Sequence, residues 1–209
     1  MNKIDKIKED IESLKVIDTK EKIISTKSEF ITLKKGYYTL NNHKIIDRET
    51  VVKNIGTGNA ACIFSVTQDK KILIVIHPRV CLPTKTKISI EIPAGYIEEN
   101  EEPIKAAKRE LEEETGYSTN NIIKIDEYYP SLGISGEKIE LFLALDCIKK
   151  KEQHLDKDEF LIYEELELEE FKYLLDNHYI MDANARIGYY HYLDYIKDVQ
   201  IWEEEKKEG

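Results

Sequence analysis

The amino-acid sequence predicts an α+β fold with a small antiparallel sheet at the N-terminus, and three observations support this prediction. Residues 60–76 contain two apolar strand patterns around a polar turn. Residues 88–116 read as a half-buried strand, a glycine loop and an amphipathic helix. Residues 21–53 contain short strand patterns that would form a small antiparallel sheet with a limited core. We therefore expect a helix and β-sheet region at 1–53 and the main domain at 54–209.

The N-terminal region begins with apolar residues at helical spacing between charges, over residues 1–17. This amphipathic helix has two open interpretations, packing on its own domain or contact with a second subunit. Gly36 and the pair at 41–42 mark expected turns. Small sheets often need another surface to cover one face. The strands expected here are 23–24, 30–33, 37–40 and 45–52.

The rest of the chain alternates strands and helices around two polar segments. A Pro-Ser-Leu-Gly loop covers residues 130–136, and a charged loop begins at Lys149. No internal repeat is present in the sequence. We expect strands at 122–129, 139–145 and 160–166, and helices at 168–175 and 182–202.

Composition limits the partners that this chain can have. The net charge is −10, and the segment 98–114 holds eight Glu against two Lys and one Arg. This charge disfavours nucleic acid, whose binding depends on Lys and Arg. The sequence has no apolar signal core and no apolar run long enough to span a membrane, so we expect a cytoplasmic protein. Three cysteines without metal spacing predict reduced, buried or half-buried thiols: Cys62, Cys81 and Cys147.

The helix in the central segment carries clustered carboxylates on one edge. Pro103 suits its first turn and Gly116 suits a left-handed position after its end. At about 100° per residue, Glu110 and Glu114 lie nearly one above the other, with Glu113 one turn along and slightly aside. These carboxylates repel one another, and the repulsion grows near an apolar core.

An acidic run on a helix is usually a solvated face. Here a glycine loop precedes the run and an Arg-Glu pair lies within it, which favours a cation site instead. Hard divalent cations prefer carboxylate and carbonyl oxygens. Arg109 offers a second counter-charge, and Glu101 can hold it in place.

The stretch EIPAGYIEENEEPIKAAKRELEEETGY at 91–117 resembles the Nudix box. It has Gly95, Glu101, the REL at 109–111, the paired Glu that follows and the final glycine at the spacing of that motif. The one departure is Tyr117, where an aliphatic residue is usual. The resemblance implies an α/β/α Nudix sandwich with a mixed sheet and metal-dependent cleavage of a nucleoside diphosphate derivative.

Four shorter features resemble the ADP-ribose pyrophosphatase branch of the Nudix hydrolases. These are HPR at 77–79, EIPAG at 91–95, YPSLG at 129–133 and DANAR at 182–186. Two positions depart from the branch: His77-Pro78 replaces its Gln-aromatic pair, and Leu132 replaces a proline often used to assign ADP-sugar specificity.

The resemblance implies a role for each of several site residues. The metal ligands are Glu110, Glu113, Glu114 and the carbonyl of Ala94, and Arg109 and Glu101 orient them. A loop acid activates or positions water; the run at 158–160 favours Glu159, with Asp158 and Glu137 as weaker candidates. The implied substrate contacts are Arg79, Glu91, Leu132 and Gly133.

The implied activity is hydrolysis of ADP-ribose or a related nucleoside diphosphate sugar to AMP and a sugar phosphate. The cofactor is Mg²⁺, with Mn²⁺ as a substitute. The branch commonly forms homodimers through an N-terminal sheet, which agrees with the limited core at residues 1–53. The alternatives are another Nudix substrate, such as a dinucleotide polyphosphate or an oxidised nucleotide, and a sensor that binds a nucleotide sugar without cleaving it.

Overall fold

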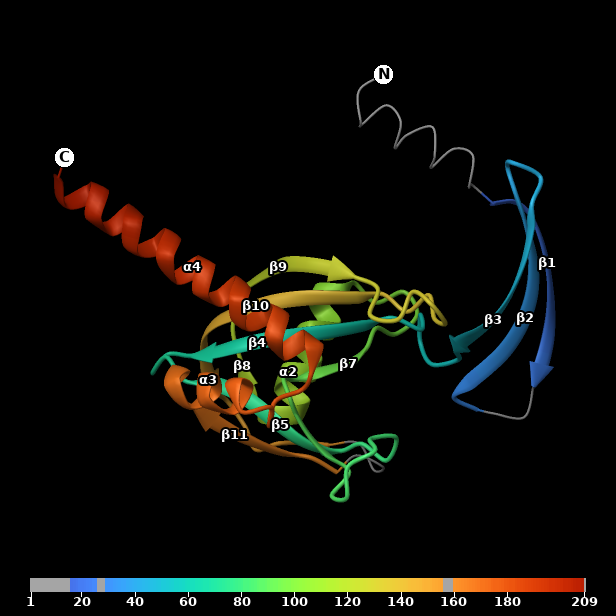
Figure 1. Ribbon diagram of the computed structural model, residues 1–209. Helices are drawn as coiled ribbons and strands as arrows, with labels where there is room; N and C mark the ends of the chain where they lie inside the picture. Colours follow the sequence, from blue (N-terminus) through green and yellow to red (C-terminus); the bar gives the residue numbers. More distant parts are fainter. Residues whose placement is uncertain (1–15, 26–28, 156–159, 209) are drawn as a thin grey trace. The chain divides into compact units, whose positions relative to one another are not determined.

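The computed structural model describes residues 16–25, 29–155 and 160–208, with side chains up to residue 200 in the last helix (Figure 1). The chain forms two compact units. The first comprises Met1–Gly58 with Ser131–Glu137, and the second comprises Asn59–Pro130 with Lys138–Gly209. The domain boundary expected between residues 53 and 54 stays a prediction.

The first unit contains a three-stranded antiparallel sheet in the order β1-β2-β3. Loop 131–137 joins this sheet, since the Val51 amide donates to the Ile134 carbonyl at 2.8 Å. The predicted small antiparallel sheet is therefore confirmed. Several apolar side chains on it are exposed, among them Ile23, Tyr37 and Ile45. The strands are β1 (Val16–Ser25), β2 (Ile31–Leu40) and β3 (Ile45–Lys53).

Two predictions for this unit concern an expected turn and an expected helix. The turn expected at Gly36 is wrong, because Gly36 lies within β2, paired with Glu21 and Arg48. A Cβ there would lie 2.5 Å from the Tyr38 ring, so the glycine makes room for that ring rather than a turn. The helix expected at 1–17 lies outside the described residues, except for its last two residues, which begin β1.

The second unit is built on an eight-stranded mixed sheet. Its path is β11-β5-β4-β10-β8, with β6 on β5, β7 on β4 and β9 on β10. The central strands β4 and β10 are parallel, whereas the other pairs are antiparallel. The strands are β4 (Ala60–Thr67), β5 (Ile72–Pro78), β6 (Ile88–Glu91), β7 (Ala94–Tyr96), β8 (Tyr117–Ser118), β9 (Asn121–Tyr128), β10 (Ile139–Lys149) and β11 (Ile162–Leu166).

Helices cover both faces of this sheet, as the α/β/α prediction requires (Figure 1). Helix α2 (Pro103–Thr115) packs Ala106, Ala107 and Leu111 on one face. Helices α3 (Leu168–Asp176) and α4 (Ala183–Glu208) cover the other. Because both faces of β4 are buried, that strand reads as a nearly continuous apolar run.

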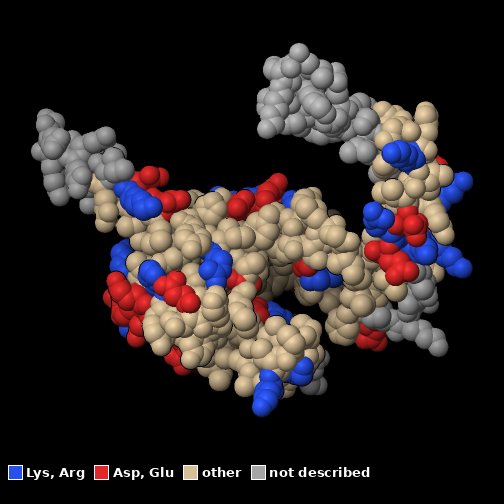
Figure 2. Space-filling model, in the orientation of Figure 1, with Lys and Arg blue, Asp and Glu red and all other residues tan. Residues whose placement is uncertain are grey.

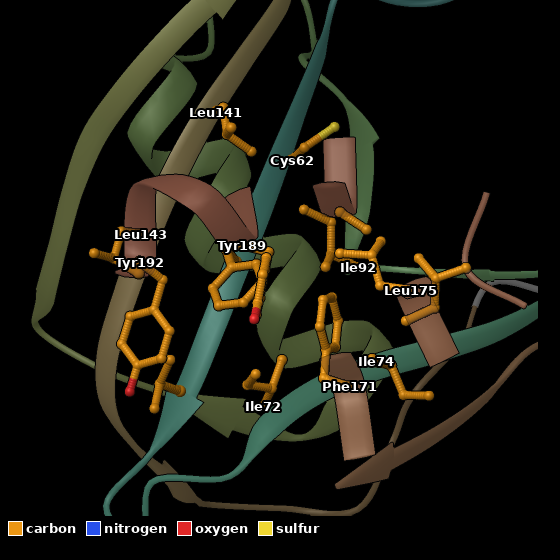
Figure 3. Close-up of a cluster of buried hydrophobic side chains, with 14 of the residues drawn as sticks. Cys62, Ile72, Ile74, Ile92, Leu141, Leu143, Phe171, Leu175, Tyr189 and Tyr192 are labelled. Atoms are coloured by element: carbon orange, nitrogen blue, oxygen red, sulfur yellow. The ribbon is translucent and has the colours of Figure 1, made fainter. Parts of the chain in front are cut away.

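Aromatic side chains fill the core beneath α3 and α4. Figure 3 shows Phe171, Tyr189 and Tyr192 gathered over Ile72 and other strand residues. Phe171 and Tyr189 stack with ring centroids 5.5 Å apart. Along α4, Tyr189 and Tyr192 are buried in this core, whereas Tyr190 is exposed.

The burial of the three cysteines agrees only in part with the prediction. Cys62 and Cys147 are buried, but Cys81 is exposed, which corrects the expectation of three buried or half-buried thiols. Cys81 lies in the loop between β5 and β6, and loops run over the surface.

Acidic and basic side chains are interspersed on the visible face of the second unit (Figure 2). Within the described residues, no helix has the length and apolar character needed to cross a membrane.

Candidate active site

Helix α2 begins and ends where its sequence signals predict. Pro103 occupies the first turn, and Gly116 follows the helix with φ 72°, its amide bonded to the Glu112 carbonyl. A Cβ at Gly116 would lie 2.1 Å from the Lys151 carbonyl oxygen. A residue other than glycine would therefore be strained and would also collide with the chain that follows β10.

The stretch predicted as a glycine loop contains strand β7 (Ala94–Tyr96), which lies directly against two carboxylates of α2. A Cβ at Gly95 would lie 2.0 Å from the carboxyl carbon of Glu110, so glycine lets the loop backbone approach this side chain. Glu114 accepts a hydrogen bond from the Ala94 amide at 2.9 Å. Glu110 and Glu114 are 7% and 3% exposed. Two predicted metal ligands are thus buried beside the loop that supplies the predicted carbonyl ligand.

Arg109 joins the carboxylates at this edge. It donates to both oxygens of Glu101 at 3.0 Å, to Glu110 at 2.7 Å and to Glu113 at 3.1 Å. A further bond at 3.0 Å reaches the Tyr96 carbonyl in β7. The pKa of Arg109 is raised, first by its bonds to Glu101, and the same bonds lower the pKa of the Glu101 carboxyl.

The donor set at this edge fits a hard divalent cation. The carboxylates of Glu110, Glu113 and Glu114, with the Ala94 carbonyl on the facing strand β7, offer only oxygen ligands, which Mg²⁺ and Mn²⁺ prefer. The described residues contain no group of three or more His, Cys, Asp or Glu side chains already arranged to hold a metal ion. Arg109 supplies the positive charge between Glu110 and Glu113.

Arg79 and Glu91, both predicted to contact substrate, form a two-pronged ion pair. Nε and Nη2 of Arg79 each donate to a different Glu91 oxygen at 2.7 Å. Burial raises the pKa of the Glu91 carboxyl, but the Arg79 bonds outweigh burial and hold this pKa below its usual range. The Arg79 pKa is raised mainly by Glu91 and further by the charges of Glu114 and Asp182. The pair therefore lies in the field of the acidic edge.

Asp182 is a neighbour of this pair that was not predicted as a site residue. Its carboxylate accepts hydrogen bonds from the amides of Asn184 at 3.2 Å and Ala185 at 2.9 Å, at the start of α4. Burial raises the pKa of this carboxyl to about 6, and the charge of Glu91 adds to the effect. The DANAR stretch is the sequence signal that marks the position.

The structure places the site residues predicted on loops in different regions, and some of them lie outside the described residues. Glu159 and Asp158 lie outside the described residues. Glu137 forms an ion pair with Lys53 within the first unit. Leu132 and Gly133 belong to the 131–137 loop of that same unit, and Leu132 is 77% exposed. The substrate roles of these last two residues stay predictions.

Comparison with known proteins supplies the family. The NUDIX domain family matches residues 56–185 of this chain. The chain belongs to the Nudix family. It is 38% identical over 147 residues to the ADP-ribose pyrophosphatase of Bacillus subtilis (strain 168), which covers 70% of this chain and 76% of that protein. It is also 35% identical over 130 residues to the methanol dehydrogenase activator of Bacillus methanolicus, covering 62% of this chain and 69% of the relative.

A solved structure shares the fold of this Nudix chain. The crystal structure of an ADP compounds hydrolase aligns with a TM-score of 0.70 at 17% identity, covering 89% of this chain and 95% of that one. At this identity the likeness concerns the fold alone. The predicted fold class and the predicted pyrophosphohydrolase class are both confirmed: the chain is a Nudix hydrolase similar to ADP-ribose pyrophosphatase.

Proposed function

We propose that this Nudix hydrolase cleaves the pyrophosphate bond of ADP-ribose or a related nucleoside diphosphate sugar, giving AMP and a sugar phosphate. The observation that carries the proposal is the acidic edge of α2, with Glu110 and Glu114 buried against the glycine loop and Arg79 in its field. The similarity to an ADP-ribose pyrophosphatase supports the choice of substrate.

The chain's own residues divide the work by position. Glu110, Glu113, Glu114 and the Ala94 carbonyl would hold Mg²⁺, or Mn²⁺ in its place. When bound, such cations neutralise charge on the pyrophosphate and lower the pKa of a nearby water. Arg109 holds two of these carboxylates in place, because it bonds to Glu110 and Glu113.

On the substrate side, Arg79 supplies N–H donors suited to phosphate oxygens. Glu91 fixes its orientation through two hydrogen bonds. Glu159 is proposed as the acid that activates water, with Leu132 and Gly133 as substrate contacts. In the reaction, water adds to one phosphorus and the bond from that phosphorus to the bridging oxygen breaks.

A substrate panel with purified protein and Mg²⁺ tests this proposal. The panel contains ADP-ribose, other nucleoside diphosphate sugars, dinucleotide polyphosphates and oxidised nucleotides, with products separated by chromatography. We expect the highest kcat/KM for ADP-ribose and AMP as the nucleotide product. A higher value for a dinucleotide polyphosphate or an oxidised nucleotide would contradict the proposed substrate, and tight binding without turnover would indicate a sensor.

We also propose that residues 1–53 mediate a homodimer. Exposed apolar side chains on the three-stranded sheet, such as Ile23, Tyr37 and Ile45, support a covering partner. Light scattering after gel filtration should then give twice the chain mass of 24.4 kDa. A single-chain mass at working concentration would contradict the dimer. The cytoplasmic location and the absence of a nucleic acid partner stay predictions.

A further inference from the structure

The C-terminal turn of α2 is electrostatically unfavourable by itself. It holds Glu112, Glu113 and Glu114 and no basic residue. The C-terminal end of a helix carries partial negative charge, so cations are favoured there and carboxylates are not. The two proposed metal ligands in this turn thus occupy the end of the helix that most opposes them. Groups outside the helix must compensate.

The carbonyl oxygens of this turn are all hydrogen-bonded. The last four carbonyls of a helix have no partner within it, so each needs a donor from elsewhere. The first of them, on Glu112, accepts from the amide of Gly116 at 2.9 Å. The other three accept from one short segment, residues 149–154. They are Glu113 from the His154 amide at 2.9 Å, Glu114 from Gln153 Nε2 at 2.6 Å, and Thr115 from Lys149 Nζ at 2.8 Å.

Lys149 is itself held by aromatic residues. Its ammonium donates to the Tyr163 hydroxyl at 2.7 Å and lies 4.2 Å from the centroid of that ring and 5.4 Å from that of Tyr117. Such contacts between a cation and a ring face are attractive. Tyr117 in turn donates to Glu165 in β11. The residue that departs from the Nudix box therefore helps to hold the cation at the end of α2.

We propose that residues 149–154 form a C-terminal clamp that positions the metal-binding carboxylates of α2, with Gln153 and Lys149 as its positioning residues. This inference rests on the proposed metal-dependent function. Glu114 is fixed at two points, its carbonyl by Gln153 and its carboxylate by the Ala94 amide. Loss of the Gln153 bond lets the last turn move relative to the glycine loop. The metal ligands then lose their common geometry while Arg79 keeps its pairing with Glu91.

Mn²⁺ titration of metal-free protein by calorimetry tests the clamp without substrate. Partners that hold metal ligands in place typically contribute about 10–100-fold in metal affinity. We therefore expect Gln153→Ala to weaken Mn²⁺ binding by about tenfold. Its KM for ADP-ribose at saturating metal should stay within about twofold, because the substrate contacts are unchanged. Glu152→Ala, at an exposed neighbour in the same segment, is the matched control and should bind Mn²⁺ as the wild type does.

Lys149 provides a second pair of variants. Lys149→Met removes the donor and the cation and should weaken Mn²⁺ binding by about tenfold, whereas Lys149→Arg keeps both and should restore most of the affinity. Folded Gln153→Ala and Lys149→Met proteins with wild-type Mn²⁺ affinity would overturn the clamp. If Gln153→Ala fails to fold, the Lys149 pair decides. A wild-type protein that binds Mn²⁺ but cleaves no nucleotide sugar contradicts the proposed function and leaves the clamp standing.

Discussion

Two arginines of the second unit meet carboxylates in different ways. Arg109 is shared among Glu101, Glu110, Glu113 and the Tyr96 carbonyl, and its side chain is 28% exposed. Among the described residues, Arg79 bonds to Glu91 through a parallel pair of hydrogen bonds, with its side chain 42% exposed. The first arrangement ties a helix to a loop. The second spends two of the five N–H donors of a guanidinium on one carboxylate.

This difference indicates two roles for arginine in the site, one structural and one in substrate binding. Arg109 connects α2, the loop before it and β7, so it holds the acidic edge in shape. Arg79 has N–H donors beyond the two that bond to Glu91, and its side chain is partly exposed. Its planar fork matches a phosphate as well as a carboxylate. We therefore expect changes at the Arg109 cluster to affect rate and stability, and changes at Arg79 to affect substrate affinity.

The largest expected effect lies in the Arg109 cluster. Glu114→Gln keeps an oxygen for the Ala94 amide but removes a charge from the proposed metal site. We expect kcat with Mg²⁺ to fall by about a hundredfold to a thousandfold, as loss of charge stabilisation in a transition state does elsewhere. Glu102→Gln is the control, because the exposed Glu102 side chain pairs only at the surface with Lys105, at 3.0 Å at the start of α2. Its rate should stay within about twofold, and wild-type turnover by Glu114→Gln would refute the metal-site assignment.

A substitution of Arg109 tests the expected effect of its cluster on stability. Arg109→Ala removes a charged partner of Glu110, whose side chain is only 10% exposed. We expect the free energy of unfolding in urea, without added metal, to fall by about 3 kcal/mol. Lys105→Ala on the same helix breaks an exposed pair with Glu102 and should cost less than about 0.5 kcal/mol. Equal losses in the two variants would show that Arg109 is no more than a surface charge.

Asp182, near the Arg79–Glu91 pair, gives a prediction about the pH dependence of stability. Its folded-state pKa is raised from the ordinary 3.8 to about 6, mainly by burial. The folded protein thus binds this proton more tightly than the unfolded chain, and stability is lost as pH rises through about 6. Asp182→Asn keeps a good helix cap and removes the buried charge. Its free energy of unfolding should exceed that of the wild type by about 2 kcal/mol at pH 8, with less than about 1 kcal/mol left at pH 4. A pH-independent difference in urea midpoints would contradict this account.

The smallest effect is expected at Arg79. Arg79→Lys keeps the charge but loses the planar fork. We expect KM for the nucleotide sugar to rise by about tenfold with kcat within about threefold, the pattern of lost ground-state binding. Steady-state kinetics at saturating Mg²⁺ measures both. A fall in kcat at constant KM would move Arg79 from the substrate side to the chemical step.

The helix ends, which have local signals, were predicted well, whereas the pairings between distant segments were not. Pro103 and Gly116 mark the ends of α2 by themselves, because helix starts and stops depend on neighbouring backbone geometry. The turn predicted at Gly36 was wrong, because glycine is present there to leave space for the ring of Tyr38 inside a strand. The short strands β7 and β8 carry no periodicity of their own and exist through pairing with β4 and β10.

The sequence by itself determined the strand and the helix within residues 88–116, the carboxylates on one helix edge and the Nudix family. These depend on spacing along a helix and on a local motif, which one segment holds complete. Only the tertiary structure decided that Arg79 pairs with Glu91, that Asp182 lies beside them, and that residues 149–154 hold the end of α2. Those contacts join segments far apart in the chain, so they follow from how the sheet brings its edges together.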